Sequence, residues 1–305
     1  MRPPAEAIGA LALIVGAIAL LIFIGVEAAL LYSAWRYRAS RVPGIAPQIQ
    51  GNRTLEVVWT AIPLLILVVV FVLMTGTMRE IGASVAGGST PAQMRILARG
   101  YQWWWEYRYP SSGGDVVVAN ELHIPVNTPV DLDLESADVV HSFWVPDISG
   151  KTDMIPGKTN HLRLYAAHTG SYSGQCAEFC GVEHAWMRIV VVAEPQADFD
   201  RWLAGQAAKA PLTFAADPGQ IVFSSNLCVS CHTIRGTAAT GIAGPDLTHI
   251  GSRTTLGAGV LKNDAASMRA WLADPQKYKP GSLMPRVPLS DADLDVLVKY
   301  LEGLK

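Results

Sequence analysis

The chain has 305 residues, of which 50% are hydrophobic and only 16% charged, and its formal net charge is -2. This length predicts about two domains, or three if one part is a membrane anchor. A mean hydropathy of +0.25 is too high for a disordered or fibrous chain and indicates a protein that lies partly in a membrane. The near-neutral charge excludes a generally basic nucleic-acid-binding protein, and no nucleic-acid partner is expected.

Two uncharged stretches, residues 7–26 and 57–78, predict a transmembrane helical hairpin within residues 1–90. At a rise of about 1.5 Å per residue, either helix is long enough to cross a hydrocarbon core. The loop between them has no acidic residue and carries Arg36, Arg38, Arg41 and Arg53. By the positive-inside rule this loop is cytoplasmic, so both termini and everything after about residue 80 are expected outside the cytoplasm.

Two acidic residues lie in or beside the predicted spans. Glu27 follows the first apolar stretch, and Glu56 marks the cytoplasmic start of the second. An ionisable side chain at membrane depth is a candidate functional group, whereas a glutamate that snorkels or faces another subunit is the competing interpretation.

Residues 91–195 change to short, strand-like runs. Val116 to Val118 and Met187 to Val192 are strand-like runs, and residues 130–135 alternate between apolar and acidic side chains. Turn-forming residues separate the runs, notably at Ser111 to Gly114 and at Pro156-Gly157. Short strands of this kind over a hundred residues predict an all-β sandwich or barrel.

One segment of this predicted β domain carries metal-binding side chains. Cys176, Cys180, His184 and Met187 occur within twelve residues, and His141 lies upstream. Two thiolates, two imidazoles and a thioether form the ligand set expected for copper in an electron-transfer site. A disulfide would leave the histidines and the methionine unexplained, and zinc has little use for a thioether.

Residues 1–195 resemble subunit II of cytochrome c oxidase, a haem-copper oxidase subunit with a dinuclear CuA centre in a cupredoxin-like domain. The resemblance is carried by His141-Ser-Phe-Trp-Val-Pro, by Lys151-Thr-Asp-Met-Ile-Pro-Gly, by the Cys176 to Met187 run, and by Glu56-Val-Val-Trp-Thr-Ala-Ile-Pro. It implies that both cysteines bridge two copper ions. The other implied ligands are His141, His184, Met187 and the backbone carbonyl of Glu178.

The same resemblance implies three further roles. The side chain of Glu178 would bind a magnesium ion at the boundary with subunit I, and Glu56 would stand at the mouth of a proton channel that leads into subunit I. In the run Tyr101-Gln-Trp-Trp-Trp, Trp103 would be the point at which electrons arrive from cytochrome c. Clustered aromatic residues on a strand are otherwise usually core.

Residues 196–217 are rich in alanine and predict a partly helical linker. After it, Cys228-Val-Ser-Cys231-His232 matches the attachment signature of a c-type haem, with thioethers from the cysteines and His232 under the iron. A redox-active or zinc-binding pair of cysteines does not require the adjacent histidine.

Residues 218–305 resemble a class I cytochrome c, an all-α domain, in the order of Gly219 and Phe223, the haem motif, Gly244-Pro245 and Met284-Pro285. A methionine as second axial ligand gives a potential suited to passing single electrons. We expect Met284 in this role, with Met268 and His249 as alternatives. The resemblance implies that Pro245 orients the proximal histidine.

The order of anchor, copper domain and haem domain predicts an electron-accepting subunit of a respiratory haem-copper oxidase in a bacterial inner membrane. Its expected partners are subunit I, subunit III, and a donor such as a cytochrome c or a quinol–cytochrome c reductase complex. Dioxygen reduction to water and proton pumping would occur in subunit I. The alternatives are a subunit of a membrane nitric oxide reductase and a free-standing membrane-anchored electron carrier.

Overall fold

The computed structural model describes residues 3–38, 40–41, 44, 51–85, 92, 94–210 and 217–305. Two compact units are present: the first helices, up to Gly82, form one, and residues 83–305 form the other. The described residues confirm the predicted multidomain class, with two apolar helices, a β-rich domain and a mainly helical C-terminal domain.

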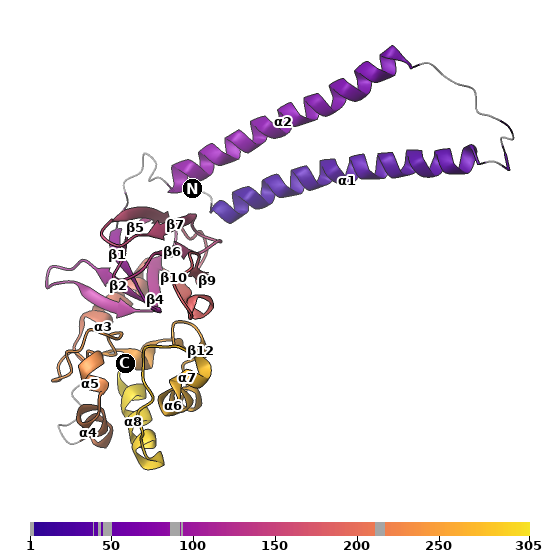
Figure 1. Ribbon diagram of the computed structural model, residues 1–305. Helices are drawn as coiled ribbons and strands as arrows, with labels where there is room; N and C mark the ends of the chain where they lie inside the picture. The colour runs from indigo at the N-terminus through magenta and orange to yellow at the C-terminus, as the bar shows by residue number, and fades with distance from the viewer. Residues whose placement is uncertain are drawn as a thin grey trace. The chain divides into compact units, whose positions relative to one another are not determined.

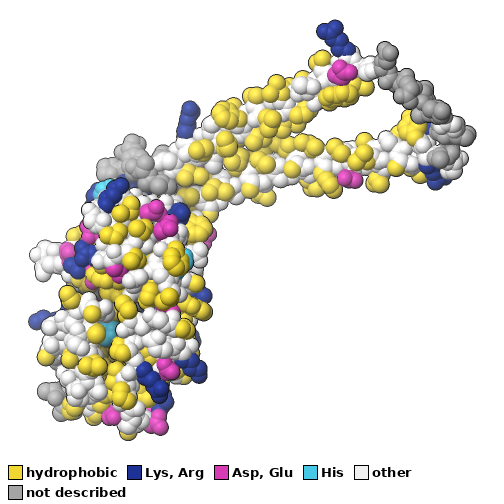
Figure 2. Space-filling view, viewed as in Figure 1, with side chains coloured by type: hydrophobic (Ala, Val, Ile, Leu, Met, Phe, Trp, Pro, Cys, Tyr) yellow, Lys and Arg dark blue, Asp and Glu magenta, His cyan; other side chains and the backbone are white. Residues whose placement is uncertain are grey.

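The first unit consists of two long helices, α1 (Pro4–Arg36) and α2 (Arg53–Val85). Both are long and apolar enough to cross a membrane. Their apolar side chains are exposed along nearly the whole length of both rods (Figure 2), as expected for helices that face lipid and not a protein core. The predicted hairpin is confirmed, although the helices extend beyond the two uncharged stretches.

The β domain consists of two five-stranded sheets, ordered β3-β2-β1-β5-β8 and β4-β10-β9-β6-β7 (Figure 1). The strand bounds are β1 Met94–Tyr101, β2 Trp104–Tyr109, β3 Val116–Ala119, β4 Glu121–Pro125, β5 Val130–Ser136, β6 His141–Trp144, β7 Lys151–Met154, β8 Asn160–Leu164, β9 Gly170–Cys176 and β10 Arg188–Glu194. Strand β1 pairs in parallel with β5, and β4 pairs in parallel with β10. These parallel pairs join strands that are distant in sequence, and the two sheets share one core as a β-sandwich.

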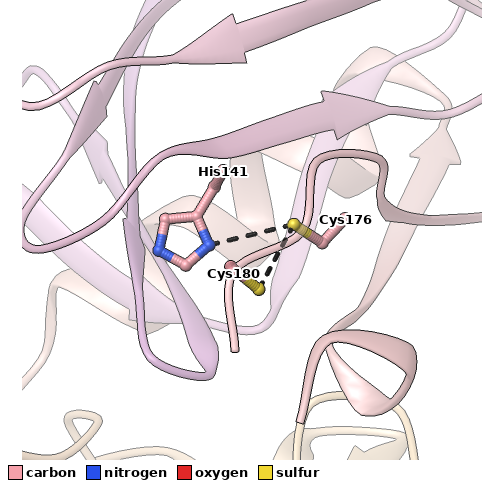
Figure 3. Close-up of side chains that lie close together, drawn as sticks. All are labelled: His141, Cys176 and Cys180. Atoms are coloured by element: carbon pink, nitrogen blue, oxygen red, sulfur yellow. Dashed lines mark hydrogen bonds between the residues drawn. The ribbon is translucent and has the colours of Figure 1, made fainter. Parts of the chain in front are cut away.

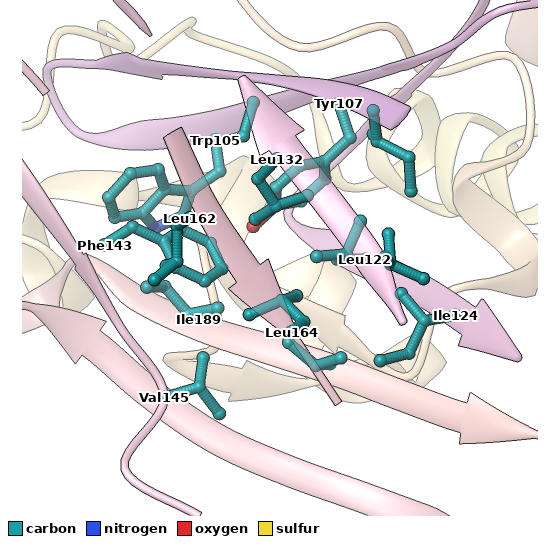
Figure 4. Close-up of a cluster of buried hydrophobic side chains, with 14 of the residues drawn as sticks. Trp105, Tyr107, Leu122, Ile124, Leu132, Phe143, Val145, Leu162, Leu164 and Ile189 are labelled. Atoms are coloured by element: carbon teal, nitrogen blue, oxygen red, sulfur yellow. The ribbon is translucent and has the colours of Figure 1, made fainter. Parts of the chain in front are cut away.

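Side chains that face inward from both sheets form the core of this domain (Figure 4). In β5, Val130, Leu132 and Leu134 are fully buried, as the alternating pattern predicted. Large aromatic residues fill the centre, including Trp105, which contacts Phe143 edge to face with the ring centroids 5.8 Å apart. Each fully buried side chain of this size contributes about 1.5–3 kcal/mol relative to exposure, so the core fixes the strand ends that carry the site.

The predicted linker begins as helix α3 (Gln196–Ala207), which packs on the β domain. Phe199 is fully buried in the core of that domain, and the Trp202 ring stacks on His123 at 4.0 Å. The first half of residues 196–217 is therefore attached to the β domain, while residues 211–216 lie outside the described residues.

The C-terminal domain contains helices that surround a second core. They are α4 (Pro218–Ser225), α5 (Cys228–Cys231), α6 (Ala265–Ala273), α7 (Pro275–Tyr278) and α8 (Asp291–Gly303), with a short ladder of β11 (Thr255–Leu256) and β12 (Leu261–Lys262). Ser290 caps α8 by accepting from the Asp293 backbone N–H. The apolar face of α8 is buried, and Gly219 of α4 lets the two helices approach, because a Cβ there would overlap the backbone of Val296.

Candidate metal and haem sites

Three of the predicted copper ligands lie together at the end of the β domain (Figure 3). His141 begins β6 and Cys176 ends the adjacent strand β9, so antiparallel pairing brings distant parts of the chain together. His141 Nδ1 lies 3.8 Å from Cys176 Sγ, and the Sγ atoms of Cys176 and Cys180 are 3.7 Å apart. Both thiols are free and buried, which contradicts the disulfide interpretation.

The remaining predicted ligands complete the same cluster. His184 Nδ1 lies 3.6 Å from Cys180 Sγ, and Met187 Sδ lies 3.9 Å from it. The carbonyl oxygen of Glu178 lies 3.2 Å from Cys176 Sγ. Two sulfurs flanked by two imidazole nitrogens, a thioether and a carbonyl match the donor set of a two-copper centre. The side chains fit this group.

The His141 ring is held by residues that the sequence did not single out. Its Nε2 lies 2.8 Å from Asp138 Oδ1, which leaves Nδ1 directed at the sulfurs. A carboxylate on the far nitrogen is the usual way in which a metal-binding histidine is oriented. Gly100 leaves room for the ring, since a Cβ there would come within 2.9 Å of His141 Cδ2. Asp138 stands three residues before His141 in the sequence. That spacing could have identified its carboxylate as the partner of the histidine ring.

The two thiols influence each other's acidity. Hydrogen bonding with Cys180 and with His141 holds the pKa of Cys176 well below its ordinary value. The Cys176 thiolate in turn raises the pKa of Cys180. As metal ligands both sulfurs would be thiolates, and metal binding would release the protons that they carry.

Trp103 fixes the loop between the two cysteines. Its indole Nε1–H donates to the carbonyl of Cys180 at 2.9 Å, and the side-chain amide of Gln102 donates to the same oxygen at 2.8 Å. Gly181 follows with a φ of +118°, a conformation that favours glycine, and its Cα packs on the Trp103 ring. The Trp103 side chain is 9% exposed. Through its indole hydrogen bond, the aromatic residue predicted for electron transfer directly contacts the copper loop.

A cavity of about 280 Å³ lies in the C-terminal domain, and the predicted haem residues line it. Cys228 and Cys231 of α5, His232, Pro245 and Met284 all contribute to its wall. Most of the remaining lining is apolar, and the set includes Leu247, Leu256, Trp271, Leu272, Leu283 and Leu301. An apolar cavity with two thiols and an imidazole at one wall fits a covalently attached porphyrin.

His232 is oriented as an axial ligand needs to be. Its Nδ1–H donates to the carbonyl of Pro245 at 2.8 Å, which leaves Nε2 free to bind a metal. Gly244 packs on the ring, because a Cβ at that position would come within 2.7 Å of His232 Cε1. Burial lowers the pKa of His232, so the imidazole is kept in the neutral form that a metal requires.

The three candidates for the second axial ligand occupy different places. Met284 and Met268 both line the cavity, and Met268 is also 2% exposed within the hydrophobic core of the domain. His249 does not line the cavity, and its Nε2 lies 3.0 Å from the carbonyl of Ala208. The geometry therefore favours a methionine over His249.

The haem cavity is closed on one side by the β domain. Gln102, Trp103, Trp104 and Asn120 belong to its wall, although they lie more than a hundred residues before the haem motif. Trp104 stacks on Tyr101 with parallel rings 4.4 Å apart. Trp103 thus lines the haem cavity and also bonds to the copper loop, which joins the two sites.

The glutamates considered for roles with partner subunits lie on different elements of the chain. Glu178 is half-buried in the loop between the two cysteines, and Glu56 lies exposed in the first turn of α2. Glu27 lies within α1, with an exposed side chain. Their predicted roles require other chains and stay predictions.

This fold and these two sites define a membrane-anchored electron-transfer protein that combines a copper-type β domain with a cytochrome c domain. The chain belongs to the cytochrome c oxidase subunit 2 family, and it is a component of an oxidoreductase complex. Sequence profiles for the transmembrane domain and the periplasmic domain of cytochrome c oxidase subunit II match residues 2–74 and 112–194, and the cytochrome c profile matches residues 216–305.

Similar proteins include cytochrome c oxidase subunit 2 of Alkalihalophilus pseudofirmus, 38% identical over 88% of this chain and 79% of that protein. The subunit 2 of Bacillus sp. (strain PS3) is 33% identical over 89% of this chain and 80% of that protein. A crystal structure of the periplasmic domain of subunit II of the Bradyrhizobium japonicum cytochrome oxidase is 34% identical, with a TM-score of 0.36, and the match covers 38% of this chain and 94% of that chain.

Proposed function

We propose that this chain is the electron-accepting subunit of a respiratory haem-copper cytochrome c oxidase. Electrons from an external donor would reach haem c first, pass by way of Trp103 to the CuA centre, and continue to subunit I for reduction of dioxygen to water with proton pumping. The observation that carries the proposal is the double contact of Trp103, which lines the haem cavity and donates its indole N–H to the Cys180 carbonyl.

The side chains of this chain would each have a defined task. Cys176 and Cys180 would bridge the copper ions, with His141, His184, Met187 and the Glu178 carbonyl as further ligands. Cys228, Cys231, His232 and Met284 would hold haem c. When bound, the two groups supply one-electron redox chemistry. The protein contributes orientation: Asp138 and Pro245 fix the two histidines, and the apolar walls exclude water.

Fusion of the haem domain to the copper domain has a kinetic consequence. Transfer between the two sites would be intramolecular, so it would depend on an effective concentration set by docking and not on diffusion. A donor would then need to meet only the haem domain.

The assembled complex, purified in mild detergent, provides the direct test. We expect two copper ions and one haem c per chain, and oxygen uptake with a reduced cytochrome c as donor. Nitric oxide consumption without oxygen reduction would indicate the reductase alternative. A single exchangeable copper without a large partner subunit would indicate a free-standing carrier.

Trp103→Phe tests the route between the sites. The variant loses the indole N–H that bonds to Cys180, and we expect electron transfer from haem c to copper to slow by about tenfold or more, which is about 1.4 kcal/mol in activation free energy. Trp202→Phe, in the helix α3 on the same domain, is the control because Trp202 does not line the haem cavity. Unchanged transfer in Trp103→Phe would contradict the route.

The roles that involve other subunits are proposals as well. We expect Glu56→Gln to slow proton uptake in the assembled oxidase, and normal turnover would remove the proton-channel role. Magnesium would bind the Glu178 carboxylate at the boundary with subunit I. The chain would cross a bacterial inner membrane twice, with both termini and both metal domains outside the cytoplasm, and protease treatment of intact spheroplasts tests this orientation.

A further inference from the structure

Lys279 is a buried cation at the contact between the β domain and the haem domain. It directly follows the short helix α7 and is 3% exposed. Lysine is almost never fully buried unless its charge is paired, because removing an ammonium from water is costly. The burial of Lys279 therefore indicates that its ammonium group has specific partners.

The Lys279 ammonium binds one backbone carbonyl from each domain. It donates to the carbonyl of Trp103 in the β domain at 2.8 Å and to that of Gly257 in the haem domain at 3.1 Å. Gly257 has a φ of +62° and belongs to the turn between β11 and β12. Lys279 thus joins the haem domain to the residue whose indole contacts the copper loop.

An opposite charge in the β domain attracts the same ammonium. Glu183 is fully buried, and neither of its carboxylate oxygens has a hydrogen-bond partner among the described residues. Burial lowers the pKa of Lys279 to about 8, and the charge of Glu183 opposes that change. If the domains separated, Lys279 would lose both the Trp103 carbonyl and this charge.

Two other contacts join the β domain to the haem domain and report on docking. Glu121 of β4 accepts from the backbone N–H groups of Thr254 and Thr255, each at 2.8 Å. The Arg188 N–H of β10 donates to the carbonyl of Ala258 at 3.2 Å. These amides are paired only while the domains are docked, so their hydrogen exchange measures docking independently of electron transfer.

We propose that Lys279 is an interdomain positioning residue, which holds the haem cavity against Trp103 by binding the Trp103 and Gly257 carbonyls in the field of Glu183. The inference rests on the proposed electron transfer between haem c and CuA for its functional meaning. Electron transfer slows steeply as the distance between the two centres increases, and the buried ammonium keeps that distance short.

Lys279→Met tests this role in the complete detergent-solubilised complex, because methionine keeps an unbranched apolar side chain and removes the charge and its donors. We expect the Thr254 and Thr255 amides to exchange at least about tenfold faster, and transfer from haem c to copper to slow at least about tenfold. The copper spectrum should stay unchanged. Lys277→Met is the matched control, since Lys277 is an exposed lysine of the same short helix.

The outcomes separate this inference from the proposed function. Faster amide exchange in Lys279→Met but not in Lys277→Met supports the positioning role. Absence of electron transfer from haem to copper in the wild-type protein would reject only the proposed function and would leave the positioning role standing. Unchanged exchange overturns the role whatever the transfer rate does. If Lys279→Met fails to assemble, Lys279→Gln is used instead, because glutamine keeps an uncharged N–H donor group. The same amide-exchange and electron-transfer criteria apply to it.

Discussion

The copper cluster and the haem cavity are built in different ways. The copper cluster consists of side chains within 4 Å of a neighbour, on paired strands and one short loop, with Asp138, Gln102 and Trp103 holding them from behind. The haem residues instead surround a cavity of about 280 Å³ from separate segments of the domain. The copper site is therefore built from side chains that contact one another, whereas the haem site is built from segments that a large cofactor would contact at the same time.

This difference predicts which domain depends on its cofactor. A packed cluster needs only cations, while a haem at the centre of a domain would supply much of that domain's core contact. The haem domain should therefore fold poorly without haem, and the β domain should keep its structure without copper.

Replacing both Cys228 and Cys231 by Ala should abolish covalent haem attachment and destabilise the haem domain, because the cavity then has no tethered occupant. The copper cluster should remain, since its side chains belong to the β domain. Haem absorbance of the denatured chain and the copper spectrum measure the two effects separately. Simultaneous loss of both signals would show that the sites do not fold independently.

Met284→Leu should remove methionine ligation of the haem iron altogether, whereas Met268→Leu should retain it. Both residues line the cavity, but Met268 also lies in the hydrophobic core, where leucine is a volume-conserving replacement. The sulfur-to-iron charge-transfer absorption and the reduction potential of the haem check the assignment. The opposite pattern would make Met268 the ligand.

Asp138→Asn should weaken copper binding by about 10- to 100-fold, as is typical when the group that orients a metal-binding histidine is changed. Asparagine retains the shape of the side chain but not the charge that faces His141 Nε2. Competition with a copper chelator measures the affinity, and Asp115→Asn, in an exposed turn of the same domain, is the control. An affinity equal to that of the wild type would mean that packing against Gly100 alone orients His141.

Acid should weaken the β domain slightly through His123. Burial lowers the pKa of His123, although hydrogen bonding to Glu194 opposes the change. The unfolded chain thus binds this proton more readily than the folded one, so stability is lost as the pH falls below about 6.5, by at most about 1.4 kcal/mol per pH unit. Thermal unfolding of the full chain at pH 7.5 and 5.5 should show a smaller difference in His123→Gln, and an equal difference would exclude His123.

The short-range features of this protein were determined by its sequence. The uncharged stretches specify the two long helices, the alternation in residues 130–134 specifies the buried face of β5, and Ser290 specifies the start of α8. The spacing from Cys176 to Met187 brings ligand-type side chains together within one loop. Each of these signals acts over a few residues, where covalent spacing and side-chain periodicity leave little freedom.

The contacts between distant segments were decided by the tertiary structure. Asp138 could have been suspected from its spacing to His141, but nothing near Lys279 or Glu121 in the sequence indicates a partner more than a hundred residues away. Helix α3 resembles a linker in composition and is bound to the β domain only because Phe199 and Trp202 meet exposed apolar surface there. Such contacts depend on which surfaces the completed domains bring together, and no local pattern encodes that geometry.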